Sequence, residues 1–272
     1  MIPRCNLHTH TTYCDGDNTA EEMILSARLL GCDTLGFSGH SYLPDTDWTM
    51  SDEGQQRYIE EIERLKIKYK DDITILLGIE QDCFSEKLCP KNRFDYVIGS
   101  VHAVVKQGIR LDVDSSPTYL FRGIDHLYSG NVMALVKDYY ELVANVANET
   151  ECDIVGHFDL LTKYNEKERF LDIGSAEYKK YALEALDALL EKDVIFEINT
   201  GAISRGWRTR PYPEDFILRR LAEKKGKVMI NSDSHNKDTI FYFFDEAVAY
   251  AKSCGIKELC VFEKGKMTQV KI

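Results

Sequence analysis

Long apolar runs are absent from this 272-residue sequence. A helix that spans a membrane needs about 20 consecutive, mostly apolar residues, and no stretch of the chain approaches that length. The N-terminal residues, MIPRCNLHTH, become polar too early for the apolar segment of a secretion signal. We therefore expect a cytoplasmic protein without a membrane partner.

Material for flexible linkers is also scarce. The chain has only six prolines, and it has no tract rich in Pro, Gly or Ser, no internal repeat and no low-complexity segment. Apolar residues make up 44% of the chain, which is enough for a full core in a protein of this length. These features predict a single domain that covers residues 1–272.

Basic residues are outnumbered, with 34 Lys and Arg against 45 Asp and Glu, and the formal net charge is -11. Such a protein repels a phosphate backbone at long range, so we expect no nucleic-acid partner. A small anionic substrate remains compatible with this charge where bound metal ions reverse it locally. The eight cysteines are irregularly spaced and contain no CxxC motif, which predicts reduced thiols that mostly serve packing.

Short β-rich apolar runs alternate with helical patterns along the chain. We expect strands at 4–7, 34–38, 73–79, 94–101, 153–155, 194–198, 228–231 and 258–262, and helices at 19–30, 52–69, 131–149, 175–191, 214–225 and 239–253. The segments 83–90 and 106–130 are predicted loops. Seven or eight strands alternating with helices favour an α/β barrel of parallel strands. The alternative is an open doubly wound sheet, whose usual GxGxxG sequence is missing.

Polar residues recur where the predicted strands end. Six of the seven histidines lie there, with Glu80 after the third strand, Asp233 after the seventh, and Asp15 in the loop after the first; the histidines are His8, His10, His40, His102, His157 and His235. The carboxyl ends of barrel strands meet on one face, which is the face that carries active sites. The sequence therefore predicts that these nine side chains converge.

Residues two apart in a strand point the same way, so His8 with His10, and Asp233 with His235, can each aim two ligands at one centre. A single histidine at a strand end is more often an ordinary hydrogen-bonded residue, and the loop with Asp15 could be only a turn. The joint pattern of imidazoles and carboxylates favours a metal site. Nine ligands exceed the needs of one ion, so we expect two to three divalent ions with Glu80 as the bridging carboxylate.

Four blocks of residues together resemble the PHP superfamily, named for polymerase and histidinol phosphatase: HTH at 8–10, GH at 39–40, the histidines at 102 and 157, and DSH at 233–235. The resemblance covers almost the whole chain. It implies a distorted (β/α)7 TIM-like barrel with a trinuclear site. In that arrangement one ion is held by His8, His10, Glu80 and Asp233, a second by Glu80, His102 and His157, and a third by Asp15, His40 and His235. Some members have histidine at the position of Asp15, which puts the affinity for the third ion in question.

Within the superfamily the chain is most similar to histidinol-phosphate phosphatases, through HTHTTYCDG (8–16), GIEQD (78–82), FDYVIGSVH (94–102), GHFDL (156–160), EINT (197–200) and NSDSH (231–235). This similarity implies hydrolysis of L-histidinol phosphate to L-histidinol and phosphate in histidine biosynthesis, with Zn, Mn or Fe as the ions. One alternative is another PHP phosphoesterase that acts on nucleotides or oligonucleotides. A second is a non-catalytic metal-binding domain, which would lack ligands, whereas all nine positions are filled.

For this reaction we expect in-line attack by a metal-bridged hydroxide between the two ions that share Glu80. Asp233 and His235 are further catalytic candidates because they could move protons. Guanidinium groups bind phosphate bidentately, so Arg169 and Arg205 are the candidate substrate-binding residues, with Arg208 and Arg210 as rivals. The amino group of histidinol needs an acidic or aromatic partner, which the sequence does not single out. Oligomeric state is not readable from it either.

Overall fold

The computed structural model describes residues 4–272, and within them seven parallel strands form one sheet in the order β1-β2-β3-β4-β7-β8-β9. Their bounds are β1 Cys5–Asn6, β2 Thr34–Phe37, β3 Thr74–Asp82, β4 Tyr96–Ser100, β7 Ile154–Val155, β8 Ile195–Asn199 and β9 Lys227–Asn231. Just beyond β1 and β9, Thr9 pairs with Ser234, and the His10 N–H donates to the Ser234 carbonyl over 2.8 Å. The sheet therefore nearly closes, which confirms the expected seven-stranded barrel over the open sheet.

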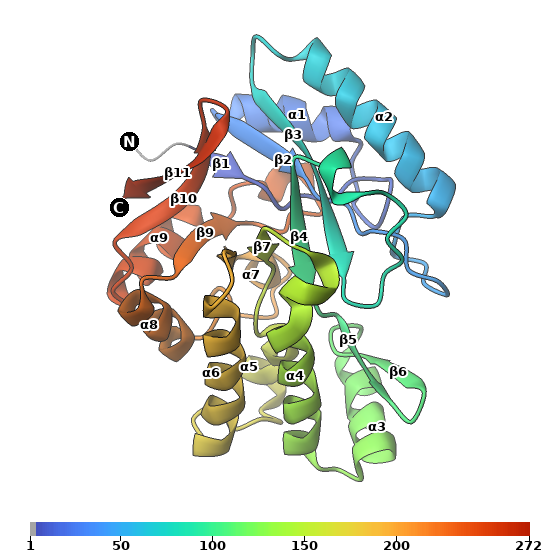
Figure 1. Cartoon of the computed structure of the whole chain (residues 1–272), viewed down its shortest axis with the longest axis vertical. Coiled ribbons are helices and arrows are strands. Elements are labelled where there is room, and N and C mark those ends of the chain that lie inside the picture. Colours follow the sequence, from blue (N-terminus) through green and yellow to red (C-terminus); the bar gives the residue numbers. More distant parts are fainter. Residues whose placement is uncertain (1–3) are drawn as a thin grey trace.

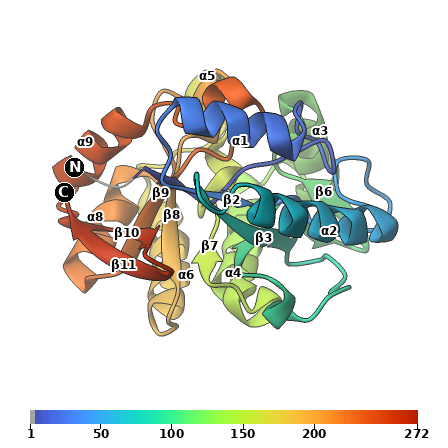
Figure 2. The ribbon, with the colours of Figure 1, turned by 90° about the horizontal axis from the view of Figure 1, so that it is seen from above.

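Helices surround this barrel (Figures 1 and 2). The α-helices are α1 Ala20–Leu29, α2 Asp52–Lys68, α3 Pro117–Tyr128, α4 Val132–Thr150, α5 Asn165–Glu168, α6 Ala176–Leu190, α7 Gly201–Ser204, α8 Asp215–Lys224 and α9 Phe244–Ser253. Three short 3-10 helices are η1 Lys91–Arg93, η2 Leu160–Thr162 and η3 Lys237–Thr239. Among residues 4–272 no helix combines the length and the apolarity that crossing a membrane requires.

Helix starts agree with the capping residues in the sequence. Thr19 and Glu22 form the reciprocal capping box at α1, and Ser51 and Ser175 cap α2 and α6 by accepting a backbone N–H. Each cap satisfies an amide that the first helical turn leaves without a partner, which fixes where the helix begins. All eight cysteines are free thiols, as their spacing predicts.

The last predicted strand, 258–262, is not an eighth barrel strand. Here β10 (Glu258–Glu263) pairs antiparallel with β11 (Lys266–Lys271), a strand that the sequence pattern did not reveal. The Thr34 hydroxyl donates to the Phe262 carbonyl over 2.9 Å, and the Phe262 N–H donates to Cys5 Sγ over 3.4 Å. Since Thr34 and Cys5 begin β2 and β1, the hairpin covers the amino-terminal end of the barrel (Figure 1).

The prediction of a loop over 106–130 is wrong. This segment contains part of the hairpin β5 (Ala103–Lys106) and β6 (Ile109–Asp112), followed by helix α3, which carries His126. Ser116 caps α3 and Pro117 stands at its first position. Four apolar residues at helical spacing are buried, namely Leu120, Ile124, Leu127 and Tyr128. The predicted helix 239–253 also begins later, because η3 and a turn precede α9.

Strand side chains alternate between two apolar clusters. Ile75, Leu77 and Ile79 of β3 belong to the larger core between the sheet and the helices, whereas Leu76 belongs to a smaller cluster that includes the buried residues of β10. Tyr96 of β4 lies in this smaller cluster and its hydroxyl donates to the Phe37 carbonyl over 3.1 Å. A β-carbon at Gly78 would clash with the Tyr96 ring, so glycine there makes room for it.

Candidate metal centre and active site

The inward-facing positions of the strands change from apolar to polar toward the carboxyl end of the barrel. In β3 the residues of this face are Leu76, Gly78, Glu80 and Asp82, in chain order. In a strand every second residue points to the same side, so the apolar interior around Tyr96 gives way to two carboxylates along this face of β3. The other strands follow the same rule, with inward series such as Ile98, Ser100 and His102, or Met229, Asn231 and Asp233.

Glu80 lies at the centre of the convergence and is 1% exposed. Its Oε2 is 2.9 Å from His40 Nδ1 and 3.3 Å from His8 Nε2. Its Oε1 is 3.1 Å from His157 Nε2 and 3.4 Å from His102 Nε2. The two oxygens thus face different sets of imidazoles, which is the arrangement that a bridging carboxylate requires.

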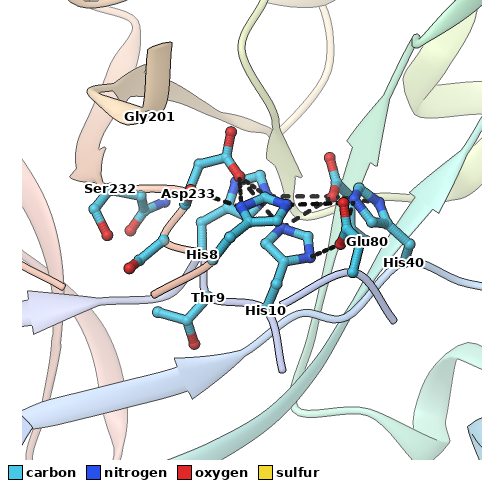
Figure 3. A network of polar contacts seen from close by, with 12 residues as sticks. His8, Thr9, His10, His40, Glu80, Gly201, Ser232 and Asp233 are labelled. Carbon is cyan, nitrogen blue, oxygen red and sulfur yellow. Dashed lines mark hydrogen bonds and ion pairs between the residues drawn. The ribbon is translucent and has the colours of Figure 1, made fainter. Parts of the chain in front are cut away.

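Asp233 and Asp15 complete the cluster on its other side. Asp233 Oδ1 is 3.3 Å from His10 Nε2, and Asp15 Oδ2 is 3.1 Å from His235 Nε2. Asp233 has a φ of 48°, a left-handed conformation that Asp tolerates better than most residues and that turns the chain sharply after β9. Figure 3 shows His8 and His10 between Asp233 on one side and Glu80 with His40 on the other.

All nine residues singled out in the sequence therefore meet in one place. Four groups have ligand atoms within 4.8 Å of one another: His10, Asp15, His40 and His235; His8, His10 and Asp233; His8, Glu80 and His157; His40, Glu80 and His102. These four groups differ from the three sets of ligands that the resemblance implies. In particular, His40 lies between the Asp15 group and the Glu80 group, whereas the resemblance assigns it to Asp15 and His235 alone.

The donor atoms fit divalent metal ions. Among the described residues, the buried side-chain atoms without a hydrogen-bond partner include Nε2 of His8, Nε2 of His10 and Oε2 of Glu80. Leaving such atoms unpaired in a protein interior costs about 1–3 kcal/mol each. They face one another across 3.3 Å and 3.6 Å, and all are nitrogen or oxygen donors of the kind that Zn, Mn or Fe accept.

Two further carboxylates hold the imidazoles in place. Glu197 Oε1 is 2.7 Å from His8 Nδ1, and Asp82 Oδ2 is 3.0 Å from His102 Nδ1. A carboxylate accepts a hydrogen bond from the Nδ1–H group, so it selects the tautomer that leaves Nε2 free to bind a metal. Neither residue is among those predicted from the sequence, although the strand period could have identified both. Asp82 shares the face of Glu80, and Glu197 is the second inward position of β8.

Charges within the cluster shift the pKa values of its members. Burial raises the pKa of Glu80, but His40, His8 and His102 outweigh burial and hold it well below its ordinary value. Burial lowers the pKa of His10 to about 3, and the neighbouring His235 and His40 act in the same direction. At neutral pH the cluster thus offers an ionised central carboxylate and a neutral imidazole, the states in which these groups bind a cation.

A pocket of about 450 Å³ opens over the cluster. It is lined by the ligand candidates Asp15, His40, His102, His157, Asp233 and His235, and beyond them by Asp45, Thr46, Asp47, Trp48, Asp112, Asp114, Ser115, Leu160, Lys163 and Arg205. Its walls come from the loop after β2, the end of β6, the segment around η2, and α7. This position next to the metal-ligand candidates makes it the place where a substrate would bind.

The four arginines considered from the sequence occupy different places. Arg205 lines the pocket, and its Nη2 donates to Asp233 Oδ2 over 3.0 Å. Arg169 is exposed at the end of the four-residue helix α5 and does not line the pocket. Arg208 is buried against Glu214, with Nη2 2.7 Å from Oε1, and Arg210 is exposed.

Lys163, which is not among the residues predicted from the sequence, is the second cation that lines the pocket. It follows η2, only six residues after His157, and its side chain is 11% exposed. Its closeness to His157 in the sequence could have suggested Lys163 as a pocket residue, but the 3-10 helix η2 between them was not predicted. The direction of its side chain therefore could not be inferred.

The chain is similar to proteins of one known family over most of its length. The family model described as PHP domain matches residues 6–201. A protein of Schizosaccharomyces pombe named probable histidinol-phosphatase is 31% identical over 222 residues, which are 76% of this chain and 69% of that protein. A Deinococcus radiodurans protein of the same name is 29% identical over 268 residues, covering 94% of this chain and 95% of the relative.

A solved structure has the same fold. It is a histidinol phosphate phosphatase from Lactococcus lactis, complexed with zinc, L-histidinol and phosphate. The two structures superpose with a TM-score of 0.72 at 22% identity, and the match covers 97% of this chain and 99% of the other. The shared fold therefore extends over nearly the whole length of both chains.

Proposed function

This chain belongs to the PHP domain family, and on that premise we propose that it is a metal-dependent histidinol-phosphatase. It hydrolyses L-histidinol phosphate to L-histidinol and phosphate, a step of histidine biosynthesis. The observation that carries the proposal is the convergence of nine imidazole and carboxylate groups on Glu80 at the mouth of the barrel, beside a pocket with two cations. Similarity to relatives named histidinol-phosphatase over nearly the whole chain supports the choice of substrate.

The metal ligands in this proposal are His8, His10, Asp15, His40, Glu80, His102, His157, Asp233 and His235. They would hold two to three divalent ions, Zn, Mn or Fe, with Glu80 shared between sites. When bound, such ions supply a nucleophile at neutral pH and neutralise phosphoryl oxygens. This contribution is large because phosphate monoesters are among the slowest bonds to hydrolyse in water.

The remaining tasks fall to protein side chains. Arg205 and Lys163 both line the pocket, where their positive charges can neutralise and orient phosphoryl oxygens. In this proposal Lys163 binds the phosphoryl group, the role for which the sequence suggested Arg169. Asp233 and His235 adjoin each other, with Oδ1 and Nδ1 3.5 Å apart, and are the candidates for moving protons during hydrolysis.

The pocket suits a small substrate rather than a polymer. Its volume of about 450 Å³ accommodates a phosphorylated amino alcohol. Four aspartates line it in addition to the metal-ligand candidates, which disfavours a polyanion. We also propose a cytoplasmic location, as expected of an enzyme of amino-acid biosynthesis.

The test is a phosphate-release assay with purified protein loaded with Zn, Mn or Fe. Its substrates are L-histidinol phosphate, nucleoside monophosphates and bisphosphates, and short oligonucleotides. We expect L-histidinol phosphate to give the highest kcat/KM, and activity to disappear with a chelator and return with metal. Faster turnover of a nucleotide or an oligonucleotide would overturn the choice of substrate. Bound metal without phosphatase activity on any of these compounds would overturn the catalytic role.

A further inference from the structure

A partly buried ion pair forms part of the pocket wall next to the metal-ligand candidates. Lys163 Nζ is 3.2 Å from Asp114 Oδ2 and donates to the Asp114 carbonyl over 3.0 Å. The Tyr164 hydroxyl donates to the same carbonyl. Asp114 follows β6 and Lys163 follows η2, so these contacts join two segments that are far apart in the sequence and hold the Asp114 backbone in place.

The Asp114 carboxylate lies near two of the metal-ligand candidates, His102 and His157. Both Asp114 and Lys163 line the pocket that His102 and His157 also line. Burial raises the pKa of Asp114, but Lys163 and the imidazoles of His102 and His157 outweigh it, so its pKa lies below the ordinary value. The carboxylate is therefore ionised at neutral pH. The contact with Lys163 uses Oδ2, and since a carboxylate has about four acceptor positions, Asp114 can still accept from a ligand.

The proposed substrate requires such a group. L-Histidinol phosphate carries an ammonium on the carbon next to the one that bears the phosphate ester. When the phosphoryl group lies over the metal-ligand candidates, the ammonium lies within a few ångströms of the ester oxygen. A cation in this position, beside bound metal ions, needs an ionised acceptor. Apart from the metal-ligand candidates, the charged groups that line the pocket are the cations Arg205 and Lys163 and the four aspartates Asp45, Asp47, Asp112 and Asp114.

We propose that Asp114 binds the ammonium group of the substrate and thereby selects phosphate esters with an amino group on the adjacent carbon. Lys163 is the positioning residue that holds the carboxylate toward the pocket. This inference rests on the proposed function and adds a basis for discriminating between phosphomonoesters. Recognition of the ammonium group can discriminate between substrates, whereas binding of the phosphate group is common to all phosphomonoesters.

The other aspartates of the pocket are less suited to this role. Asp112 is paired with Arg110, whose Nε is 2.8 Å from Oδ1. Asp45 and Asp47 are exposed, in the loop after β2. A charge in water contributes little to binding compared with one in a partly buried site. Asp45 therefore provides a matched control, because its change to Asn removes the same charge from the same pocket.

The experiment compares two substrates on the same enzyme preparations: L-histidinol phosphate and the imidazolylpropyl phosphate that lacks only the amino group. The wild-type protein should prefer the amino substrate by about 10- to 100-fold in kcat/KM, as expected for a hydrogen bond between charged groups. Asp114→Asn should abolish this preference by lowering kcat/KM for the amino substrate alone. Asp45→Asn should keep it. Because the measured quantity is a ratio, a smaller folded fraction in a variant cancels.

Three outcomes would overturn the inference. An equal rate of both substrates in the wild-type protein would refute ammonium recognition and leave the phosphatase function standing. A loss in Asp114→Asn that is the same for both substrates would assign Asp114 to phosphate binding or to folding. If the wild-type protein hydrolyses neither substrate, the proposed function fails, and this inference fails with it.

Discussion

Replacing Glu197 tests whether this carboxylate fixes the tautomer in which His8 binds a metal. Glu197 is fully buried and accepts four hydrogen bonds: from His8 Nδ1 over 2.7 Å, from Asn231 Nδ2 over 2.9 Å, from the His157 N–H over 2.9 Å and from Asn199 Nδ2 over 2.8 Å. The first two reach Oε1 and the last two reach Oε2. Each oxygen thus serves two donors, and no lone-pair direction is spare for a proton.

Glu197→Gln keeps the shape but converts one of these acceptors into a donor. The backbone N–H of His157 cannot change its role, so the glutamine oxygen should face it and the NH2 group should face His8. His8 would then have to accept at Nδ1 and carry its proton on Nε2, the atom 3.3 Å from Glu80 Oε2. A protonated Nε2 cannot bind a metal. Substitutions of such orienting groups typically cost about 10- to 100-fold in metal affinity or activity, which is about 1.4–2.7 kcal/mol.

The assay is activity against free metal concentration in a chelator-buffered series. Glu197→Gln should need about 10- to 100-fold more free metal for half-maximal activity, and added metal should restore part of the lost rate. Glu141→Gln, on the exposed face of α4, is the control and should match the wild-type curve. A Glu197→Gln protein with unchanged metal dependence would refute the proposed control of the His8 tautomer.

Three other predictions concern the metal centre and the core. His102→Ala should leave the circular dichroism spectrum close to wild type and lower kcat at least about 100-fold, whereas global unfolding would make His102 structural. Burial lowers the pKa of His8, but Glu197 and Glu80 outweigh burial and raise it well above the ordinary value when no metal is bound. Protons therefore compete with metal for His8, and the metal affinity measured by chelator competition should fall between about pH 8 and about pH 6. A metal affinity that stays constant over this range would contradict the prediction. Burial also raises the pKa of Tyr140 well above 10, so the folded state retains a proton that the unfolded chain loses, and stability falls as pH rises above about 10. Tyr140→Phe removes this difference. In urea unfolding experiments above about pH 10, the free energy of unfolding of the variant should fall less steeply with pH, by about 1.4 kcal/mol per pH unit. An unchanged slope would show that Tyr140 titrates normally in the native state.

The identity of the candidate ligands was accessible from the sequence because it follows from local rules. A parallel strand has a direction, its residues alternate between two faces, and the carboxyl ends of such strands meet at one end of a barrel. His8, Glu80 and Asp233 could therefore be placed together without knowing any distance. Capping at Thr19 and Ser51 was equally readable, because a cap depends on a few neighbouring residues.

Contacts between distant segments were not accessible. The sequence could not show that Asp114 and Lys163, 49 residues apart, form an ion pair in the pocket wall, or that Arg169 does not line the pocket. The pairing of β10 with β11 also depends on where the barrel leaves apolar surface uncovered.

The chain by itself thus determined the alternation of strands and helices, the end of the barrel that carries the polar groups, and the chemical type of those groups. Only the tertiary structure decided which imidazole faces which oxygen of Glu80, that Glu197 and Asp82 orient two of the rings, and which cations reach the pocket. The physical reason is that strand period and capping act over a few residues. The direction of a side chain in a pocket depends on packing among segments that the backbone brings together from across the whole chain.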